Sequence, residues 1–97
     1  MLTRDQIKDA VKKIAPQYNI DQVYLFGSYA RGDATEESDV DFRIVGGDFP
    51  SLLNLGGLYS DFEDIFNIKI DLVMTDKISE KFYRLIEEDE VLIYAKV

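Results

Sequence analysis

The sequence contains no cysteine, no histidine and no tryptophan. Without cysteine the chain forms no disulfide, carries out no thiolate catalysis and builds no cysteine-ligated zinc site. Without histidine it lacks the side chain most often used as a base near neutral pH, and it cannot form a Ser-His or Cys-His nucleophile. Any chemistry must therefore use carboxylates, hydroxyls, Lys, Arg, backbone amides or metal ions held by oxygen.

Long apolar runs are also missing. No stretch approaches the roughly 20 residues that span a bilayer, and the first residues, Met1 to Asp5, contain no apolar signal-peptide core. We therefore expect a cytoplasmic protein with no membrane contact. With 97 residues, of which 46% are hydrophobic and 12% aromatic, the chain is expected to fold as a single domain over residues 1–97.

Positive charge is scarce. The chain has 11 Lys and Arg against 19 Asp and Glu, which gives a net charge of −8. The cations are scattered along the sequence, whereas binding to a polyanion needs a basic face. We therefore expect no direct nucleic-acid binding. An acidic chain suits a basic protein partner, but its charge alone does not identify one.

The order of the predicted elements indicates the fold class. Thr3 and Gln6 have the spacing of a capping box and Pro16 ends the first helical pattern. Helical patterns cover residues 4–14, a short segment within 27–32, 49–66 and 79–88. Strand patterns cover residues 22–26, 39–45, 68–74 and 91–94. This alternation predicts an α/β (α+β) fold, a small mixed sheet of about four strands with helices packed on it.

Several surface and core assignments follow from the same patterns. Gly56 and Gly57 interrupt the third helical pattern, where each glycine costs about 1 kcal/mol, so they permit a kink or break there. The acidic run from Glu87 to Glu90 is interpreted as a solvated helix end, with contact to a basic partner as the alternative.

The apolar face of the third pattern comprises Leu52, Leu55, Leu58, Tyr59, Phe62, Ile65 and Phe66, and that of the last helix Phe82, Leu85 and Ile86. Core or cleft lining is expected, with a partner surface as the alternative, for Tyr29, Phe49, Leu52, Leu53 and Tyr59.

Two aspartates in the second predicted strand are the first candidates for chemistry. Asp39 and Asp41 lie two residues apart, so their side chains share one face of the strand at a spacing of about 6 to 7 Å. No lysine neighbours them in the sequence. Two such carboxylates form an oxygen site suited to Mg²⁺. The alternative is an exposed strand edge with two solvated carboxylates.

A glycine and a serine before these aspartates favour the first interpretation. Gly27 directly follows a predicted strand, where a glycine lets the backbone approach a ligand closely, and Ser28 can donate to a phosphate oxygen. Ser28 could instead cap the short helix. A third carboxylate, Asp71, interrupts an apolar strand, where an unpaired charge is costly unless it lies at an edge or pairs with an arginine. Together the three aspartates can hold two divalent ions for displacement at phosphorus.

The combination of Gly27-Ser28, ten further residues and Asp39-Val40-Asp41 resembles the signature of the polymerase-beta-like nucleotidyltransferase superfamily. The chain is most similar to its short members, the minimal nucleotidyltransferases, from about residue 7 to residue 94. The resemblance implies that Asp39 and Asp41 hold two Mg²⁺ ions, that Asp71 completes the metal site and helps to deprotonate or orient an attacking hydroxyl, and that Gly27 and Ser28 bind the β- and γ-phosphates.

The resemblance also implies roles around this set. Arg31 is expected near the phosphates, or else in a surface salt bridge with Asp33, Glu36 or Glu37. Ser38 is expected to orient the loop before the aspartates, and Gly32 to end the short helix.

Minimal nucleotidyltransferases are commonly paired with a helical HEPN ribonuclease as toxin and antitoxin. The family resemblance implies that the chain is the antitoxin, a protein adenylyltransferase that moves AMP from ATP to a tyrosine hydroxyl of the HEPN toxin and releases pyrophosphate. Two alternatives stay open. The chain could neutralise its partner by binding alone, or it could transfer a nucleotide to a small-molecule hydroxyl.

Overall fold

A computed structural model describes all 97 residues of the chain. It contains four α-helices, two short 3₁₀ turns and four strands. The helices are α1 (Arg4–Ile14), α2 (Ser28–Arg31), α3 (Leu52–Phe66) and α4 (Glu80–Glu87), and the 3₁₀ turns are η1 (Ala15–Tyr18) and η2 (Thr75–Lys77). The strands are β1 (Ile20–Phe26), β2 (Val40–Gly46), β3 (Ile70–Met74) and β4 (Val91–Ala95). None of the helices combines the length and apolar character of a membrane span.

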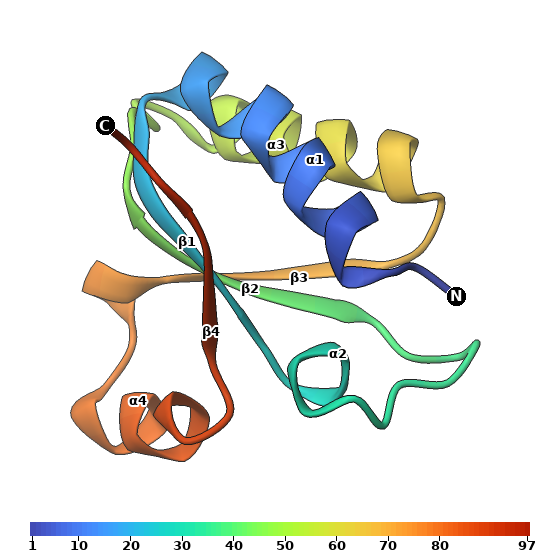
Figure 1. The fold of residues 1–97 in the computed structure, drawn as a ribbon. Helices are drawn as coiled ribbons and strands as arrows, with labels where there is room; N and C mark the ends of the chain where they lie inside the picture. Colours follow the sequence, from blue (N-terminus) through green and yellow to red (C-terminus); the bar gives the residue numbers. More distant parts are fainter.

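The strands form one mixed sheet in the order β3-β2-β1-β4. Strand β1 is antiparallel to both of its neighbours, whereas β2 and β3 run parallel. Helices α1 and α3 lie together over one face of the sheet, and α4 lies on the opposite side (Figure 1). This confirms the predicted α+β class with a four-stranded mixed sheet.

The first helix begins as the sequence predicts. The Thr3 hydroxyl accepts from the Gln6 amide at 3.1 Å, and the Gln6 side chain accepts from the Thr3 amide at 2.8 Å. Helix α1 ends at Ile14, and Pro16 lies at the start of the 3₁₀ turn that follows it. The buried face of the helix consists of Ile7, Ala10, Val11 and Ile14, which fill the core between α1 and the sheet.

The long helix α3 is continuous through Gly56 and Gly57, so the break that these glycines permit does not occur. Gly57 faces Tyr18, whose hydroxyl would lie 3.0 Å from a Cβ at that position, whereas nothing lies within 4 Å of one at Gly56. Tyr18 donates to Asp61 at 2.6 Å, and burial together with this bond raises the pKa of Tyr18 to about 12. Gly57 therefore permits a close approach between α3 and η1.

The buried stripe of α3 is narrower than the sequence pattern. Leu58, Phe62 and Phe66 are buried, and Phe62 packs on Phe42 of β2 with ring centroids 5.0 Å apart. At the two ends of the helix, Leu52 is 87% exposed and Ile65 is half exposed. Three of the seven expected apolar positions are therefore buried in the core.

Helix α4 is attached to the sheet in a way that periodicity does not reveal. Of its three expected inward residues only Ile86 is buried, while Phe82 is partly exposed and Leu85 is 70% exposed. The helix and the turn after it are held instead by the buried Arg43 of β2, which forms an ion pair with Glu90. The prediction for Leu85 is therefore wrong.

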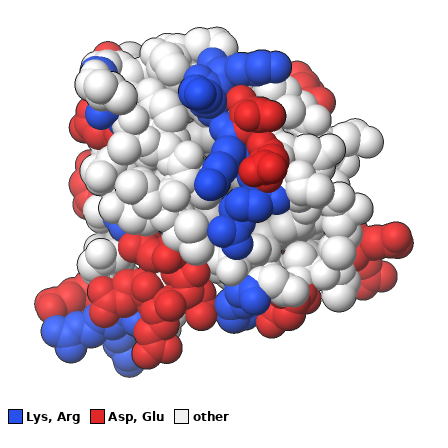
Figure 2. Space-filling view, viewed as in Figure 1, with Lys and Arg blue, Asp and Glu red and all other residues white.

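The charges are less scattered than they are in the sequence. Four of the 11 cations lie on α1, namely Arg4, Lys8, Lys12 and Lys13. Figure 2 shows a band of basic side chains over the α1 face, interrupted by acidic ones, and a mainly acidic region near α4. The band is of mixed sign, which limits the field that it can produce.

Candidate active site

The register of three strands brings the predicted site residues to one end of the sheet. Phe26, the last residue of β1, pairs with Asp41 in the antiparallel β1–β2 ladder. Asp41 in turn pairs with Asp71 in the parallel β2–β3 ladder. Directly opposite residues in a ladder share a face of the sheet, so the two carboxylates lie next to each other. Asp39 directly precedes β2, on the same side as Asp41 because side chains two apart share a face.

Asp41 is the most perturbed carboxylate of this group. Its side chain is half-buried, and desolvation raises its pKa to about 6, with further contributions from the charges of Asp71 and Asp39 and a hydrogen bond to Asp71. The charge of Arg31 acts in the opposite direction. Like charges gathered in this way favour either a proton or a cation between them.

The backbone conformation of the turn between β1 and α2 requires a glycine at position 27. Its φ of 77° and ψ of −156° are accessible only to glycine without strain. A Cβ there would overlap the Asp41 carboxylate and lie 3.2 Å from its Cγ. The turn between β1 and α2 can therefore pass against the carboxylate only because residue 27 has no side chain.

Ser28 begins α2, but it does not cap the helix, because Gly27 occupies the N-cap position and no side-chain cap is formed. The Ser28 hydroxyl makes no hydrogen bond within the protein. It therefore remains available to a ligand, as the phosphate-binding interpretation requires. Gly32 ends α2 with a φ of 87°, as the sequence predicts.

Arg31 forms the surface salt bridge that was one of its two expected roles. It contacts Asp33 at 3.2 Å and, in addition, Asp89 at 3.3 Å, whereas Glu36 and Glu37 are not its partners. These carboxylates raise the pKa of Arg31, and the guanidinium is close enough to lower that of Asp41. Arg31 therefore lies near the site carboxylate Asp41 and at the same time forms the surface salt bridge.

A lysine that the sequence interpretation missed lies beside Asp39. The Lys69 ammonium is 3.8 Å from the Asp39 carboxylate, because the parallel pairing places Lys69 next to Val40, whose amide donates to the Lys69 carbonyl at 3.1 Å. The statement that no lysine neutralises the aspartate pair is therefore correct for the sequence and wrong for the structure. A separation of 30 residues hides this contact from any local pattern.

The donor set fits a divalent cation, although the carboxylates are not gathered around one point. Carboxylate oxygens are the ligands that Mg²⁺ prefers, and Gly27 leaves room against Asp41. No group of three acidic side chains already forms a metal cluster, since Asp41 is turned to Asp71 and Asp39 to Lys69. Holding an ion would require an ionised Asp41, which a pKa of about 6 provides at neutral pH, and a turn of the carboxylates toward a common point.

The loop before the aspartates is ordered by its own side chains. The Ser38 hydroxyl accepts from the Thr35 amide at 2.8 Å, and the Ser38 amide donates to the Thr35 carbonyl at 3.0 Å. These bonds orient the segment that enters β2, which agrees with the role expected of Ser38.

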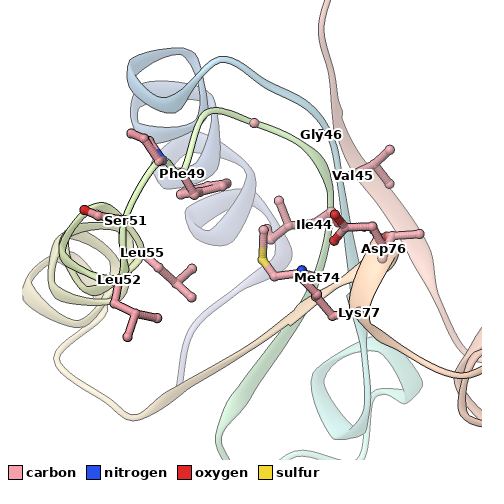
Figure 3. A pocket seen from close by; sticks show the side chains of 13 residues that line it. Ile44, Val45, Gly46, Phe49, Ser51, Leu52, Leu55, Met74, Asp76 and Lys77 are labelled. Atoms are coloured by element: carbon pink, nitrogen blue, oxygen red, sulfur yellow. The ribbon is translucent and has the colours of Figure 1, made fainter.

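The largest cavity is remote from the carboxylates. It measures about 770 Å³ and opens at the far ends of β2 and β3, where Phe49, Leu55 and Met74 line it (Figure 3). Leu52 also lines it, so Phe49 and Leu52 line a cleft as expected. Leu53 does not, and it is 85% exposed, which corrects the expectation for that residue.

The acidic run after α4 is only partly solvated, which corrects its interpretation. Glu87 and Glu88 are exposed. Asp89 pairs with Arg31, and the Glu90 side chain is 9% exposed and pairs with Arg43. Half of this run is therefore occupied by contacts within the chain.

Comparison with known proteins indicates the family of the chain. The family model described as Polymerase beta, Nucleotidyltransferase matches residues 9–97. A candidate protein adenylyltransferase of Methanocaldococcus jannaschii, MJ0128, is 35% identical over 97% of this chain and 99% of its own length. The protein adenylyltransferase MntA of Thermococcus cleftensis is 29% identical over 96% of this chain and 98% of its own length.

Solved structures share the fold. A candidate minimal nucleotidyltransferase superposes with a TM-score of 0.77 at 22% identity, covering 93% of this chain and 95% of its own. A toxin–antitoxin with AMP-PNP gives a TM-score of 0.75 at 20% identity, over 98% and 75% of the two chains. A tri-AMPylated Shewanella oneidensis HEPN toxin in complex with an MNT antitoxin gives 0.66 at 17% identity, over 96% and 70%. With the family match over nearly its full length, the chain belongs to the polymerase beta nucleotidyltransferase family and is a nucleotidyltransferase.

Proposed function

We propose that this nucleotidyltransferase is an antitoxin that transfers AMP from ATP to a tyrosine hydroxyl of a HEPN ribonuclease toxin. The observation that carries the proposal is the alignment of Asp41 with Asp71 beside the turn at Gly27. This corner supplies carboxylate oxygens and a close backbone approach, which metal-assisted phosphoryl-type transfer needs. The names of the relatives support a protein acceptor, and the toxin–antitoxin complexes of the same fold support a HEPN partner.

Each residue of the corner has a role in the proposal. Asp39 and Asp41 would hold two Mg²⁺ ions, and Asp71 would complete the site. Bound there, the ions would supply positive charge to neutralise the triphosphate and the departing pyrophosphate. Gly27 and Ser28 hold the β- and γ-phosphates, the serine through a hydroxyl that has no other partner.

The transfer itself exchanges one phosphorus–oxygen bond for another. The tyrosine oxygen bonds to the α-phosphorus, the bond from that phosphorus to the bridging oxygen breaks, and pyrophosphate leaves. Asp71 orients the hydroxyl and takes its proton. Arg31 exchanges its exposed contacts with Asp33 and Asp89 for phosphate oxygens, an exchange that costs little because exposed ion pairs are weak.

One observation favours a second candidate, an antitoxin that neutralises its partner by binding without transfer. The three aspartates do not converge on a common point, and Asp39 already has Lys69 as a counter-ion. If the carboxylates remain so arranged, the chain masks its partner and modifies nothing.

The test uses the purified chain, a HEPN protein from the same genome, Mg²⁺ and ATP. Intact mass of the HEPN protein is followed, and peptide fragmentation locates the modified residue. We expect the mass to rise by whole AMP units, on tyrosine, with release of pyrophosphate. The Asp39→Asn/Asp41→Asn variant should lose on the order of 10²-fold or more in rate, while the control Asp76→Asn, which alters an exposed aspartate at the far end of β3, should retain it.

The outcomes separate the candidates. No mass change, with a stable complex and inhibited ribonuclease for wild type and variant alike, would establish the masking antitoxin. Transfer from GTP, CTP or UTP in place of ATP would correct the nucleotide alone. Transfer to a small-molecule hydroxyl, with the HEPN protein unmodified, would correct the acceptor.

A further inference from the structure

Strand β3, which carries Asp71, is an edge strand. Only β2 pairs with it, so the backbone groups on its outer side have no neighbouring strand. Asp41, by contrast, lies on β2, which is paired on both sides. Unpaired edge groups need another partner or water, and edge strands fray more readily than central ones. Of the two facing carboxylates, Asp71 therefore has the weaker backbone support.

A tyrosine of α3 forms hydrogen bonds with the outer, unpaired side of β3. The Tyr59 hydroxyl accepts from the Leu72 amide at 3.2 Å and donates to the Leu72 carbonyl at 3.3 Å. One hydroxyl thus satisfies both outward backbone groups of the residue that follows Asp71. Tyr59 is half-buried at the α3–β3 contact, so the packing of the helix fixes where the hydroxyl lies.

Alternation along the strand connects this contact to Asp71. Backbone groups of successive strand residues point to opposite sides, so those of Asp71 face β2 while those of Leu72 face Tyr59. The segment is therefore held from both sides at adjacent residues. We propose that Tyr59 is a positioning residue, whose hydroxyl holds Leu72 and thereby keeps the Asp71 carboxylate aligned with Asp41 for metal binding and transfer; this rests on the proposed function of Asp71.

The test compares Tyr59→Phe with Tyr94→Phe. Both changes remove one hydroxyl, but the Tyr94 hydroxyl makes no hydrogen bond and lies on β4, at the opposite edge of the sheet. We expect Tyr59→Phe to fold, because water can replace the hydroxyl at an edge. Its Leu72 amide should exchange with solvent about 10-fold faster than in wild type, as expected for local opening, and Tyr94→Phe should leave that rate unchanged.

The second measurement addresses Asp71 without catalysis. Mn²⁺ affinity, measured by electron paramagnetic resonance of the free ion without nucleotide, should weaken about 10-fold in Tyr59→Phe, in the range for residues that orient metal ligands. In an Asp71→Asn background the same change should have no further effect, because the hydroxyl acts through Asp71. In the transfer assay we expect kcat to fall while KM for ATP stays nearly constant.

Each result decides something. An unchanged Leu72 exchange rate, or faster exchange with unchanged Mn²⁺ affinity, would overturn the positioning role, as would a wild-type chain that binds no Mn²⁺. An equal loss of Mn²⁺ affinity in the Asp71→Asn background would show that Tyr59 acts elsewhere and would also overturn it. A weakened Mn²⁺ affinity that depends on Asp71, in a chain that never modifies the HEPN protein, would support Tyr59 while refuting the proposed function.

Discussion

Two charged clusters lie on the same face of β2, only two residues apart. At one, Arg43 is 4% exposed, contacts both Glu90 oxygens at 2.8 Å and lies between the rings of Tyr24 and Tyr83. At the other, Asp41 faces two further carboxylates. The first cluster pairs the charge that it buries, whereas the second gathers three carboxylates whose only nearby cations, Lys69 and Arg31, are exposed.

The two clusters therefore differ in role: the Arg43 cluster stabilises the fold, and the Asp41 cluster is suited to bind a ligand. The buried Arg43 has its charge paired by both oxygens of Glu90, and its guanidinium lies over two tyrosine rings. It therefore fixes α4, and the turn between α4 and β4, against the sheet. The carboxylates beside the turn at Gly27 repel one another unless a proton or a cation lies between them, so they destabilise the metal-free protein. The chain tolerates the second cluster because the rest of the domain, including the first, offsets it.

The largest expected effect comes from breaking the Arg43 cluster. Glu90→Ala leaves the Arg43 charge buried without a partner and should lower the free energy of unfolding by about 3 to 5 kcal/mol, as measured by urea denaturation. The control is Glu88→Ala, two residues earlier and exposed, which should change little. A loss for Glu90→Ala no larger than that of the control would mean that apolar contacts, and not the ion pair, hold α4.

A smaller effect is expected where the backbone meets the Asp41 cluster. Gly27→Ala adds a side chain at a positive φ and drives it into the Asp41 carboxylate, so we expect a loss of about 2 kcal/mol in stability together with loss of metal affinity. Gly32→Ala is the matched control, because its φ is also positive but no atom lies within 4 Å of the new Cβ. Equal metal affinity in the two variants would show that the contact with Asp41 is not important.

The smallest expected effect is a gain in the stability of the metal-free protein. The pKa of Asp41 is raised to about 6 in the folded chain, above the 3.8 of an unperturbed aspartate, so its protonated form favours folding and stability falls as pH rises between these values. Asp41→Asn should therefore stabilise the metal-free protein at pH 8 by about 1 kcal/mol, after allowance for partial exposure, and the gain should disappear by about pH 4.

Thermal unfolding at both pH values, with and without Mg²⁺, measures this gain. Mg²⁺ should stabilise wild type but not Asp41→Asn, since ligands stabilise the state that binds them. Destabilisation by Asp41→Asn at pH 8 without metal would contradict the view that the carboxylates oppose one another.

Local features of the fold were predictable because local physics decides them. The capping box at Thr3 and Gln6 and the end of α2 at Gly32 depend on a few neighbouring residues. The contact between Lys69 and Asp39 and the burial of Glu90 were not predictable, because both join segments far apart in the chain. The continuity of α3 belongs with them, since Gly57 is explained only by Tyr18 packing against it.

The sequence by itself determined the chemistry that the protein can use. The absence of cysteine and histidine leaves oxygen ligands, and Asp39 and Asp41 after a Gly-Ser turn resemble the signature of the nucleotidyltransferases. Only the tertiary structure decided which groups meet: Asp71 opposite Asp41, Lys69 beside Asp39 and Tyr59 at the edge of β3. The physical reason is that strand register and helix packing are set by the burial of the whole core, which no short segment contains.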